Sequence, residues 1–191
     1  MLLKTKNKMK REIKKIVTVP ENVDVKLNLP KITVKGPLGE LERVFNLKNV
    51  DIKMEGNQII ISQDKATKRE KKLINSTASH IVNLIKGTIK GYEYRLQICA
   101  IHFPITVKIE KSKGLFEIKN FLGENKDRVI KIVPGVDVSV EGDIVIVKGI
   151  SKELTGQQAA TIENITRVRS KDRRIFQDGI WIIKKEKGRG D

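Results

Sequence analysis

Apolar and polar residues alternate along several short stretches of this chain. A period of two is the pattern of a β-strand that buries one face and exposes the other. The alternating apolar positions of the first half are Val23, Val25, Leu27, Leu29, Ile32 and Val34. In the second half they are Ile105, Val107, Ile109, Val136, Val138 and Val140. These segments predict antiparallel strands in both halves.

Turn and helix signals follow the strands in each half. Gly56-Asn57 and Gly142-Asp143 separate apolar runs and have the chemistry of tight hairpin turns. Each hairpin is followed by one helical stretch. The first begins near Asp64, and we expect it to end at Gly87. The second is expected at about 154–168. The inward-facing positions are Ile74, Ala78, Ile81 and Ile85 in the first helix, and Ala159, Ile162 and Ile165 in the second.

The two halves also repeat one another. The segment Ile32 to Glu40 (ITVKGPLGE) aligns with Phe116 to Glu124 (FEIKNFLGE) at an offset of 84 residues. Further on, Val50 to Gly56 aligns with Val136 to Gly142 at an offset of 86 residues. Chance alternation explains the apolar positions but not the shared Leu-Gly-Glu and Glu-Gly. We interpret this as a duplication of an ~84-residue unit.

The fold class predicted is therefore α+β, a tandem duplication of a unit with an antiparallel sheet and one packed helix. We expect a basic N-terminal arm over residues 1–15 and a first repeat over 16–92. A second repeat is expected over 93–183, followed by a basic C-terminal tail over 184–191.

Composition narrows the function. The 191 residues include 39 Lys and Arg against 23 Asp and Glu, a net charge of +16, which favours a polyanionic partner. The single cysteine, Cys99, excludes an internal disulfide framework and is typical of a reducing, cytoplasmic compartment. The longest apolar runs have four residues, far short of the ~20 that span a membrane, so we expect no membrane association.

Basic residues are shared unevenly between the halves. Residues 1–91 carry 20 basic and 9 acidic side chains, a net charge of +11, and residues 92–191 carry 19 and 14, a net charge of +5. The second half nevertheless holds the denser cluster: Arg167, Arg169, Lys171, Arg173 and Arg174. One or two cations would satisfy a helix dipole, but five repel one another, which favours anion binding.

Catalytic chemistry has few candidates. Cys99 and His102 are three apart, so on a strand they point to opposite faces and cannot form a nucleophile–base pair. One Cys and two His are too few for a zinc site without carboxylates, and neither a Walker loop nor a dinucleotide fingerprint occurs. We expect no enzymatic activity, no metal and no cofactor.

The mode of nucleic-acid binding follows from what the chain lacks. Gly36-Pro-Leu-Gly39 has the spacing of a KH-domain loop, but it lies between predicted strands and is interpreted as a turn. With eight aromatic residues in all, base-stacking platforms are not expected. Contact with phosphates by Lys and Arg remains. An architectural DNA or RNA binder outside any larger assembly stays open, as does a phosphoryl-handling enzyme with an unrecognised site.

An ordered set of motifs resembles one protein family. In the first half these are VTVPENV (17–23), VKGPLGE (34–40) and KGTIKGY (86–92). In the second they are AIHFPI (100–105), IKNFLGE (118–124) and RVRSKDRRIFQDGI (167–180). Together they resemble the L-six family of large-subunit ribosomal proteins, in its archaeal and eukaryotic branch (L-nine in eukaryotic numbering).

This resemblance implies a structural constituent of the large ribosomal subunit that binds large-subunit rRNA near the sarcin-ricin loop and the stalk base. Neighbouring ribosomal proteins and nearby translation factors are the implied partners, and a homo-oligomer is not expected. In the family the second domain makes the principal RNA contacts. The rRNA-binding residues we expect are Arg167, Arg169, Lys171, Arg173 and Arg174, with Gly156 and Gln157, and in second rank Lys119, Lys126 and Arg128.

Overall fold

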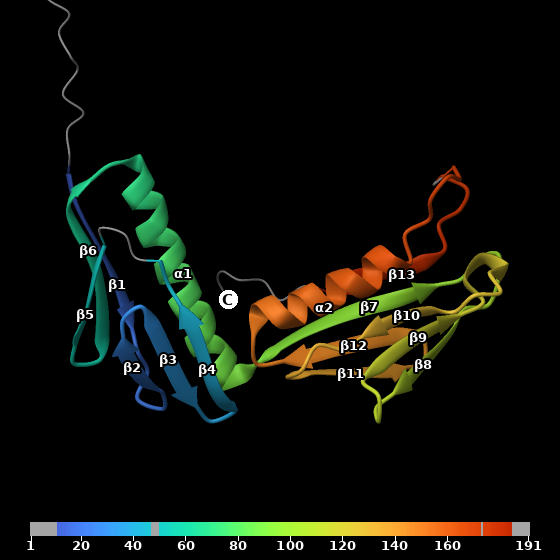
Figure 1. Cartoon of the computed structure of the whole chain (residues 1–191), viewed down its shortest axis with the longest axis horizontal. Helices are drawn as coiled ribbons and strands as arrows, with labels where there is room; N and C mark the ends of the chain where they lie inside the picture. The colour runs from blue at the N-terminus through green and yellow to red at the C-terminus, as the bar shows by residue number, and fades with distance from the viewer. Residues whose placement is uncertain (1–10, 47–49, 173, 185–191) are drawn as a thin grey trace, which may run out of the picture. The chain divides into compact units, whose positions relative to one another are not determined.

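Short antiparallel strands and two helices make up the computed structural model, which describes residues 11–46, 50–172 and 174–184 (Figure 1). The predicted α+β class is confirmed. The chain divides into two units, Met1–Ile89 and Lys90–Asp191. Within the described residues, neither helix is long and apolar enough to cross a membrane.

The first unit contains six strands and one helix. Its elements are β1 (Arg11–Thr18), β2 (Asp24–Asn28), β3 (Lys31–Gly36), β4 (Gly39–Val44), β5 (Asp51–Glu55), β6 (Gln58–Ala66) and α1 (Lys68–Lys90). The strands form two antiparallel three-stranded sheets, in the orders β1-β6-β5 and β2-β3-β4. Each unit was expected to hold one sheet; the first unit holds two.

The core of the first unit explains its helix. The predicted inward face of α1 is buried, and it packs in one cluster with strand residues of both sheets, among them Ile32, Ile59 and Ile61.

Both turns predicted in the first unit are confirmed as two-residue hairpin loops. Pro37-Leu38 joins β3 to β4, and Gly56-Asn57 joins β5 to β6, with Gly56 at a φ of 57°, which glycine adopts without strain.

The second unit repeats this arrangement and adds to it. Its elements are β7 (Tyr92–Cys99), β8 (Thr106–Glu110), β9 (Leu115–Lys119), the 3-10 turn η1 (Phe121–Gly123), β10 (Arg128–Lys131), β11 (Val136–Glu141), β12 (Ile144–Gly149), α2 (Lys152–Ile165) and β13 (Gly179–Lys184). One sheet has the order β10-β9-β8 and the other β11-β12-β7-β13. The fourth strand, β13, has no counterpart among the described strands of the first unit.

Strand pairing locates the length difference between the repeats. Ile32 faces Arg43 across the β3–β4 pair, and Phe116 faces Ile130 across the equivalent β9–β10 pair. The partners are thus 11 residues apart in the first unit and 14 in the second. The three extra residues fall between β9 and β10, in the segment that carries η1.

Several predicted boundaries were wrong. Residues 11–15 of the expected arm belong to β1, which pairs with β6, and Lys184 of the expected tail ends β13. The first helix starts at Lys68 rather than Asp64, because β6 continues to Ala66. It also runs past Gly87 to Lys90, and Gly91, with a φ of 71°, ends it instead.

The second helix is shorter than expected because hydrogen bonds of Thr166 end it at Ile165. It ends at Ile165 rather than near Val168. Buried Thr166 donates its hydroxyl to the Glu163 carbonyl (3.0 Å) and accepts a hydrogen bond from the Ile180 amide of β13 (3.0 Å). The chain therefore leaves the helix one residue before the first arginine of the basic cluster.

Candidate nucleic-acid interface

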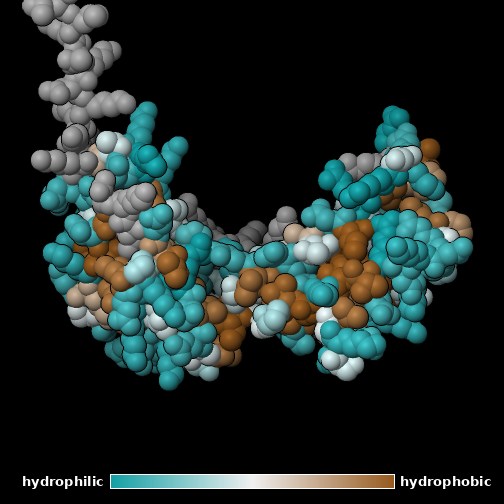
Figure 2. Space-filling model, viewed as in Figure 1, coloured by the Kyte–Doolittle hydropathy of each residue, from teal (hydrophilic) through white to brown (hydrophobic). Residues whose placement is uncertain are grey.

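Residues 166–178 join α2 to β13 and carry the predicted cluster of cations, which we call the basic loop. Val168 is buried in the second core, at 7% exposure, while Arg167 and Arg169 on either side of it are exposed. Burial of Val168 therefore holds both arginines outward. Lys171 is also exposed. Hydrophilic residues cover much of this end of the second unit (Figure 2).

The basic loop and the longer β9–β10 segment face one another across an open hollow of about 460 Å³. Arg167, Arg169 and Lys171 line it from the loop, and Phe121, Leu122, Glu124 and Arg128 from the other segment. Four cations and one carboxylate surround this space. The hollow is thus suited to a negatively charged group such as a phosphodiester segment.

Arg128 connects the two segments that line the hollow. Its Nε and Nη2 donate to the two Glu124 carboxylate oxygens (2.8 and 2.5 Å), and its Nη1 donates to the Ile165 carbonyl at the end of α2. The guanidinium carbon lies 4.1 Å from the centre of the Phe121 ring. Arg128 therefore caps α2 and joins the two walls of the hollow, with much of its charge already neutralised. Its hydrogen bonds hold the pKa of Glu124 below the ordinary value.

Arg174 is engaged within the loop itself. Its Nη2 lies 2.9 Å from Asp172 Oδ2, its Nε also contacts that carboxylate, and its backbone amide donates to Asp172 Oδ1 (3.0 Å). These bonds lower the pKa of Asp172. The Arg174 side chain is nevertheless 90% exposed, so its outer edge remains open to solvent. Arg173, also predicted to bind RNA, lies outside the described residues.

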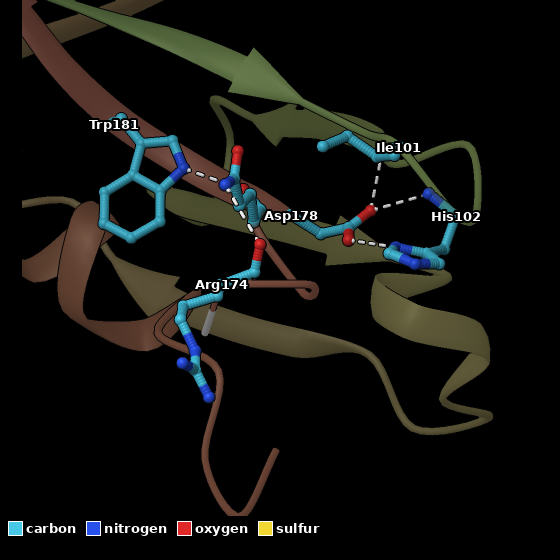
Figure 3. Close-up of polar contacts among 6 residues, drawn as sticks. Ile101, His102, Arg174, Asp178 and Trp181 are labelled. Atoms are coloured by element: carbon cyan, nitrogen blue, oxygen red, sulfur yellow. Dashed lines mark hydrogen bonds and ion pairs between the residues drawn. The ribbon is translucent and has the colours of Figure 1, made fainter. Parts of the chain in front are cut away.

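Asp178 anchors the end of the basic loop (Figure 3). It is fully buried and accepts hydrogen bonds from the Ile101 amide (2.7 Å) and the His102 amide (2.9 Å) through Oδ1. Its Oδ2 lies 2.6 Å from Nδ1 of the His102 ring. Burial alone would raise the pKa of Asp178, but the hydrogen bonds from His102 and Ile101 outweigh it and hold the pKa below its ordinary value.

Two stacked rings connect Asp178 to Lys171 of the basic loop. The His102 ring stacks on Phe176 with a centroid separation of 4.7 Å, and Lys171 Nζ lies 4.4 Å from the Phe176 centroid. Nearby, Trp181 Nε1 donates to the Gln177 carbonyl (3.2 Å), which is drawn in Figure 3. A buried carboxylate thus sets the position of a cation through His102 and Phe176.

The remaining second-rank lysines do not line this hollow. Lys119 Nζ is 2.9 Å from Asp127 Oδ2, a contact that raises the lysine pKa, and neither Lys119 nor exposed Lys126 is among the residues that line the hollow. Lys119 is therefore partly neutralised within its own segment. Lys126 lies in the segment between η1 and β10 that is longer than its counterpart in the first unit.

Gly156 and Gln157 lie in the first half of α2, at the far end of the helix from the cluster. They precede Arg167 by about ten residues, roughly 15 Å along a helix axis. Gln157 is exposed. A Cβ at Gly156 would lie 3.1 Å from the Tyr94 hydroxyl oxygen, so close packing against β7 explains this glycine. The structure does not bring this pair together with Arg167, Arg169 and Lys171.

Metal-binding groupings are missing from the part of the chain that the structure describes. No set of three or more His, Cys, Asp and Glu side chains is placed to hold a metal ion there. Cys99 is a half-buried free thiol at the end of β7, and Nδ1 of His102 is occupied by Asp178. The chemistry available at this end of the second unit is charge and hydrogen bonding.

The fold and the basic loop together define a class: duplicated α+β proteins that present a cationic loop suited to a polyanion. The family model described as "Ribosomal protein L6" matches residues 19–91 and 103–179, which include the basic loop and the β9–β10 segment. This chain belongs to the ribosomal protein L6 family.

Relatives support the same assignment over most of the chain. The protein named large ribosomal subunit protein uL6 of Staphylothermus marinus is 47% identical over 168 residues, 87% of this chain and 91% of its own. Its namesake in Aeropyrum pernix is 46% identical, covering 89% and 93% of the two chains. That of Methanobrevibacter smithii is 42% identical, covering 91% and 97%. These archaeal relatives fit the predicted archaeal and eukaryotic branch.

Proposed function

We propose that this protein is a structural constituent of the large ribosomal subunit, and that the basic loop of its second unit binds large-subunit rRNA. Family membership supports the ribosomal role, since the relatives are named as large-subunit proteins. The observation that carries the binding site is the hollow, where Arg167, Arg169 and Lys171 face the β9–β10 segment. The protein acts by binding, with no reaction of its own.

The position of the protein within the subunit belongs to the same proposal. The rRNA contacted lies near the sarcin-ricin loop and the stalk base, beside neighbouring ribosomal proteins and the path of translation factors. The protein is therefore found in the cytoplasm, in the large subunit, as a single copy rather than a homo-oligomer. Support comes from the motifs of residues 100–105, 118–124 and 167–180, which meet around the hollow and its anchor.

The residues of the interface have distinct tasks. Arg167, Arg169 and Lys171 contact phosphates, as does Arg173, while Arg174 contributes its exposed outer edge. Arg128 positions the hollow, and Lys119 and Lys126 contribute charge beside it. Gln157, with Gly156, forms a separate contact at the other end of α2. Phosphate contacts of this kind make the binding affinity depend strongly on salt and give little specificity for the RNA sequence.

Cosedimentation tests the ribosomal role. The tagged protein is expected to migrate with large subunits on a sucrose gradient at moderate salt. A loop variant, Arg167→Gln with Arg169→Gln, is expected to shift toward the top of the gradient. Both side chains are exposed, so the variant should keep the stability of the parent.

A matched control removes two exposed cations elsewhere in the second unit, Lys108→Gln with Lys131→Gln. This control variant has the same net charge as the loop variant, and it is expected to remain with the subunits. If the unaltered protein stays at the top of the gradient while large subunits migrate away, the ribosomal role is wrong. If both variants dissociate equally, total charge rather than the basic loop determines binding.

A further inference from the structure

Between residues 11 and 91, most of the net positive charge lies in two short segments. Residues 11–15 and 64–72 hold eight basic and three acidic side chains, a net charge of +5. Residues 16–63 and 73–91 together include almost five times as many residues as these two segments, but their net charge is only +2. Between residues 11 and 91, positive charge is therefore concentrated in two segments that are some 50 residues apart in the sequence.

Strand pairing brings these segments together. Arg11, the first residue of β1, pairs with Ala66 at the end of β6, two residues before α1 begins. Lys14 and Lys15 pair with Ser62 and Ile61 further along the same ladder. We call this the cationic end and define it by six exposed side chains: Lys14, Lys15, Lys68, Arg69, Lys71 and Lys72. Hydrophilic residues cover the start of α1 in Figure 2.

Within the described residues these cations form no salt bridges, although the Arg69 charge, after the hydrogen bonds from Thr67, helps to lower the pKa of Glu70. Among the described residues, no ion pair joins any of the six to a carboxylate. The nearest acid on the helix, Glu70, is engaged elsewhere, since it accepts a hydrogen bond from the Thr67 amide (2.8 Å) and another from the Thr67 hydroxyl. Other cations of the chain do pair with a nearby carboxylate, among them Lys31 in the first unit and Lys113, Lys119 and Arg174 in the second.

Placing these cations at the start of α1 lowers the stability of the helix. Lys68, Arg69, Lys71 and Lys72 occupy the first two turns of α1, where the positive end of the helix dipole repels cations. Lys68 is also three and four residues from Lys71 and Lys72, a spacing at which like charges repel. A local role in capping does not account for them, because Thr67 and Glu70 provide the cap. An external anion would offset the repulsion.

We infer that the cationic end is a second RNA-binding surface of this protein, one that contacts the phosphate backbone of a helical RNA segment separate from the segment bound by the basic loop. The inference rests on the proposed function, because it takes the partner to be RNA. The apolar side chains of α1 argue against a membrane surface: Ile74, Ile81 and Ile85 are buried in the core, which leaves no bulky apolar face to insert into lipid.

The test measures how the affinity of the full chain for a fragment of large-subunit rRNA depends on salt. The end variant carries Lys68→Gln, Arg69→Gln, Lys71→Gln and Lys72→Gln. Its control neutralises four exposed lysines elsewhere in the first unit, Lys26, Lys35, Lys53 and Lys86, each to Gln. Each lost phosphate contact reduces the slope of log Kobs against log[salt] by about 0.7–0.9, so the end variant should have a slope shallower by about 3.

The control variant is expected to change the slope by less than about 1, and the end variant should unfold at the same temperature as the parent or higher, because repulsion is relieved. An unchanged slope for the end variant, while the loop variant becomes shallower, would overturn this inference and leave the proposed function intact. Unchanged slopes for both would remove the proposed function as well. Loss of binding to phosphatidylserine-containing vesicles, without loss of RNA binding, would assign the cationic end to membranes instead.

Discussion

The two units are built on one plan and differ where the second was extended. Both contain two antiparallel sheets and one helix, with Ile32 and Phe116 fully buried at equivalent positions. Among the described residues, only the second unit has a fourth strand on its larger sheet, a longer β9–β10 segment and the basic loop between α2 and β13. The hollow lies between two of these additions.

This difference separates what the repeat needs to fold from what the second unit uses to bind. The shared positions are apolar, buried and local to each core. The additions carry exposed cations such as Arg167 and Arg169, and they are fixed by a few long-range contacts, chiefly from Asp178, Thr166 and Arg128. Substitutions at shared positions should therefore damage folding, whereas substitutions among the additions should damage binding.

The largest effect is expected at the equivalent core positions. Phe116→Ala should lower the free energy of unfolding by about 3–5 kcal/mol and Ile32→Ala by about 2–5 kcal/mol, because each leaves a cavity in a closed core. Hydrogen exchange measured by mass spectrometry should accelerate in the second unit for Phe116→Ala and in the first for Ile32→Ala. Faster exchange in both units for either variant would contradict two separate cores.

The next effect concerns the anchor of the basic loop. Asp178→Asn should cost about 1–3 kcal/mol of stability, because an amide cannot satisfy two backbone donors and the His102 ring as a carboxylate does. Binding to rRNA should weaken as Phe176 and Lys171 lose their support. Asp137→Asn, an exposed change on β11, serves as the control and should have no effect on either measurement.

Asp178 should also give the second unit a distinct response to acid. Its pKa is lowered in the folded state, so its contribution to stability is present above the unfolded value of about 3.9 and is lost as pH falls through the lower folded pKa. Urea denaturation at a series of pH values should show stability falling below about pH 4. In Asp178→Asn this acid-dependent loss should be smaller; an identical pH profile would show that Asp178 gains nothing from its partners.

A smaller effect is expected at Arg128. Arg128→Lys keeps the charge but cannot donate at once to both Glu124 oxygens and the Ile165 carbonyl, and should cost about 1 kcal/mol. The affinity for rRNA should fall modestly with an unchanged salt slope, because a positioning residue rather than a phosphate contact is altered. A slope as shallow as that of the loop variant would make Arg128 a direct RNA contact.

Much of the fold could be predicted from local pattern. The hairpins at Gly56-Asn57 and Gly142-Asp143 and the buried face of α1 follow from spacing that neighbours along the chain enforce. The boundaries were harder, because β6 competes with α1 for Asp64 and Lys65 and pairing with β1 decides the outcome. Tyr92, Tyr94 and Leu96 alternate clearly, so β7 could have been found at the expected boundary between the repeats.

The candidate site was only partly predictable. Exposed cations at Arg167, Arg169 and Lys171 could be read from the sequence, because a charge cluster is a local signal. Their contact with the β9–β10 segment could not, nor could the pairing of Asp178 with His102, 76 residues away. Such contacts depend on how the strands are arranged in the sheets, and a single sequence does not indicate which distant residues come into contact.

The salt dependence of rRNA binding tests the central claim most directly. The full chain, the loop variant and its Lys108 and Lys131 control are titrated against the same large-subunit rRNA fragment over a range of salt concentrations. The loop variant is predicted to have a slope shallower by about 1.5, with the control close to the parent and all three equally stable. Equal slopes for the loop variant and the parent would contradict the basic loop as the RNA-binding surface of the second unit.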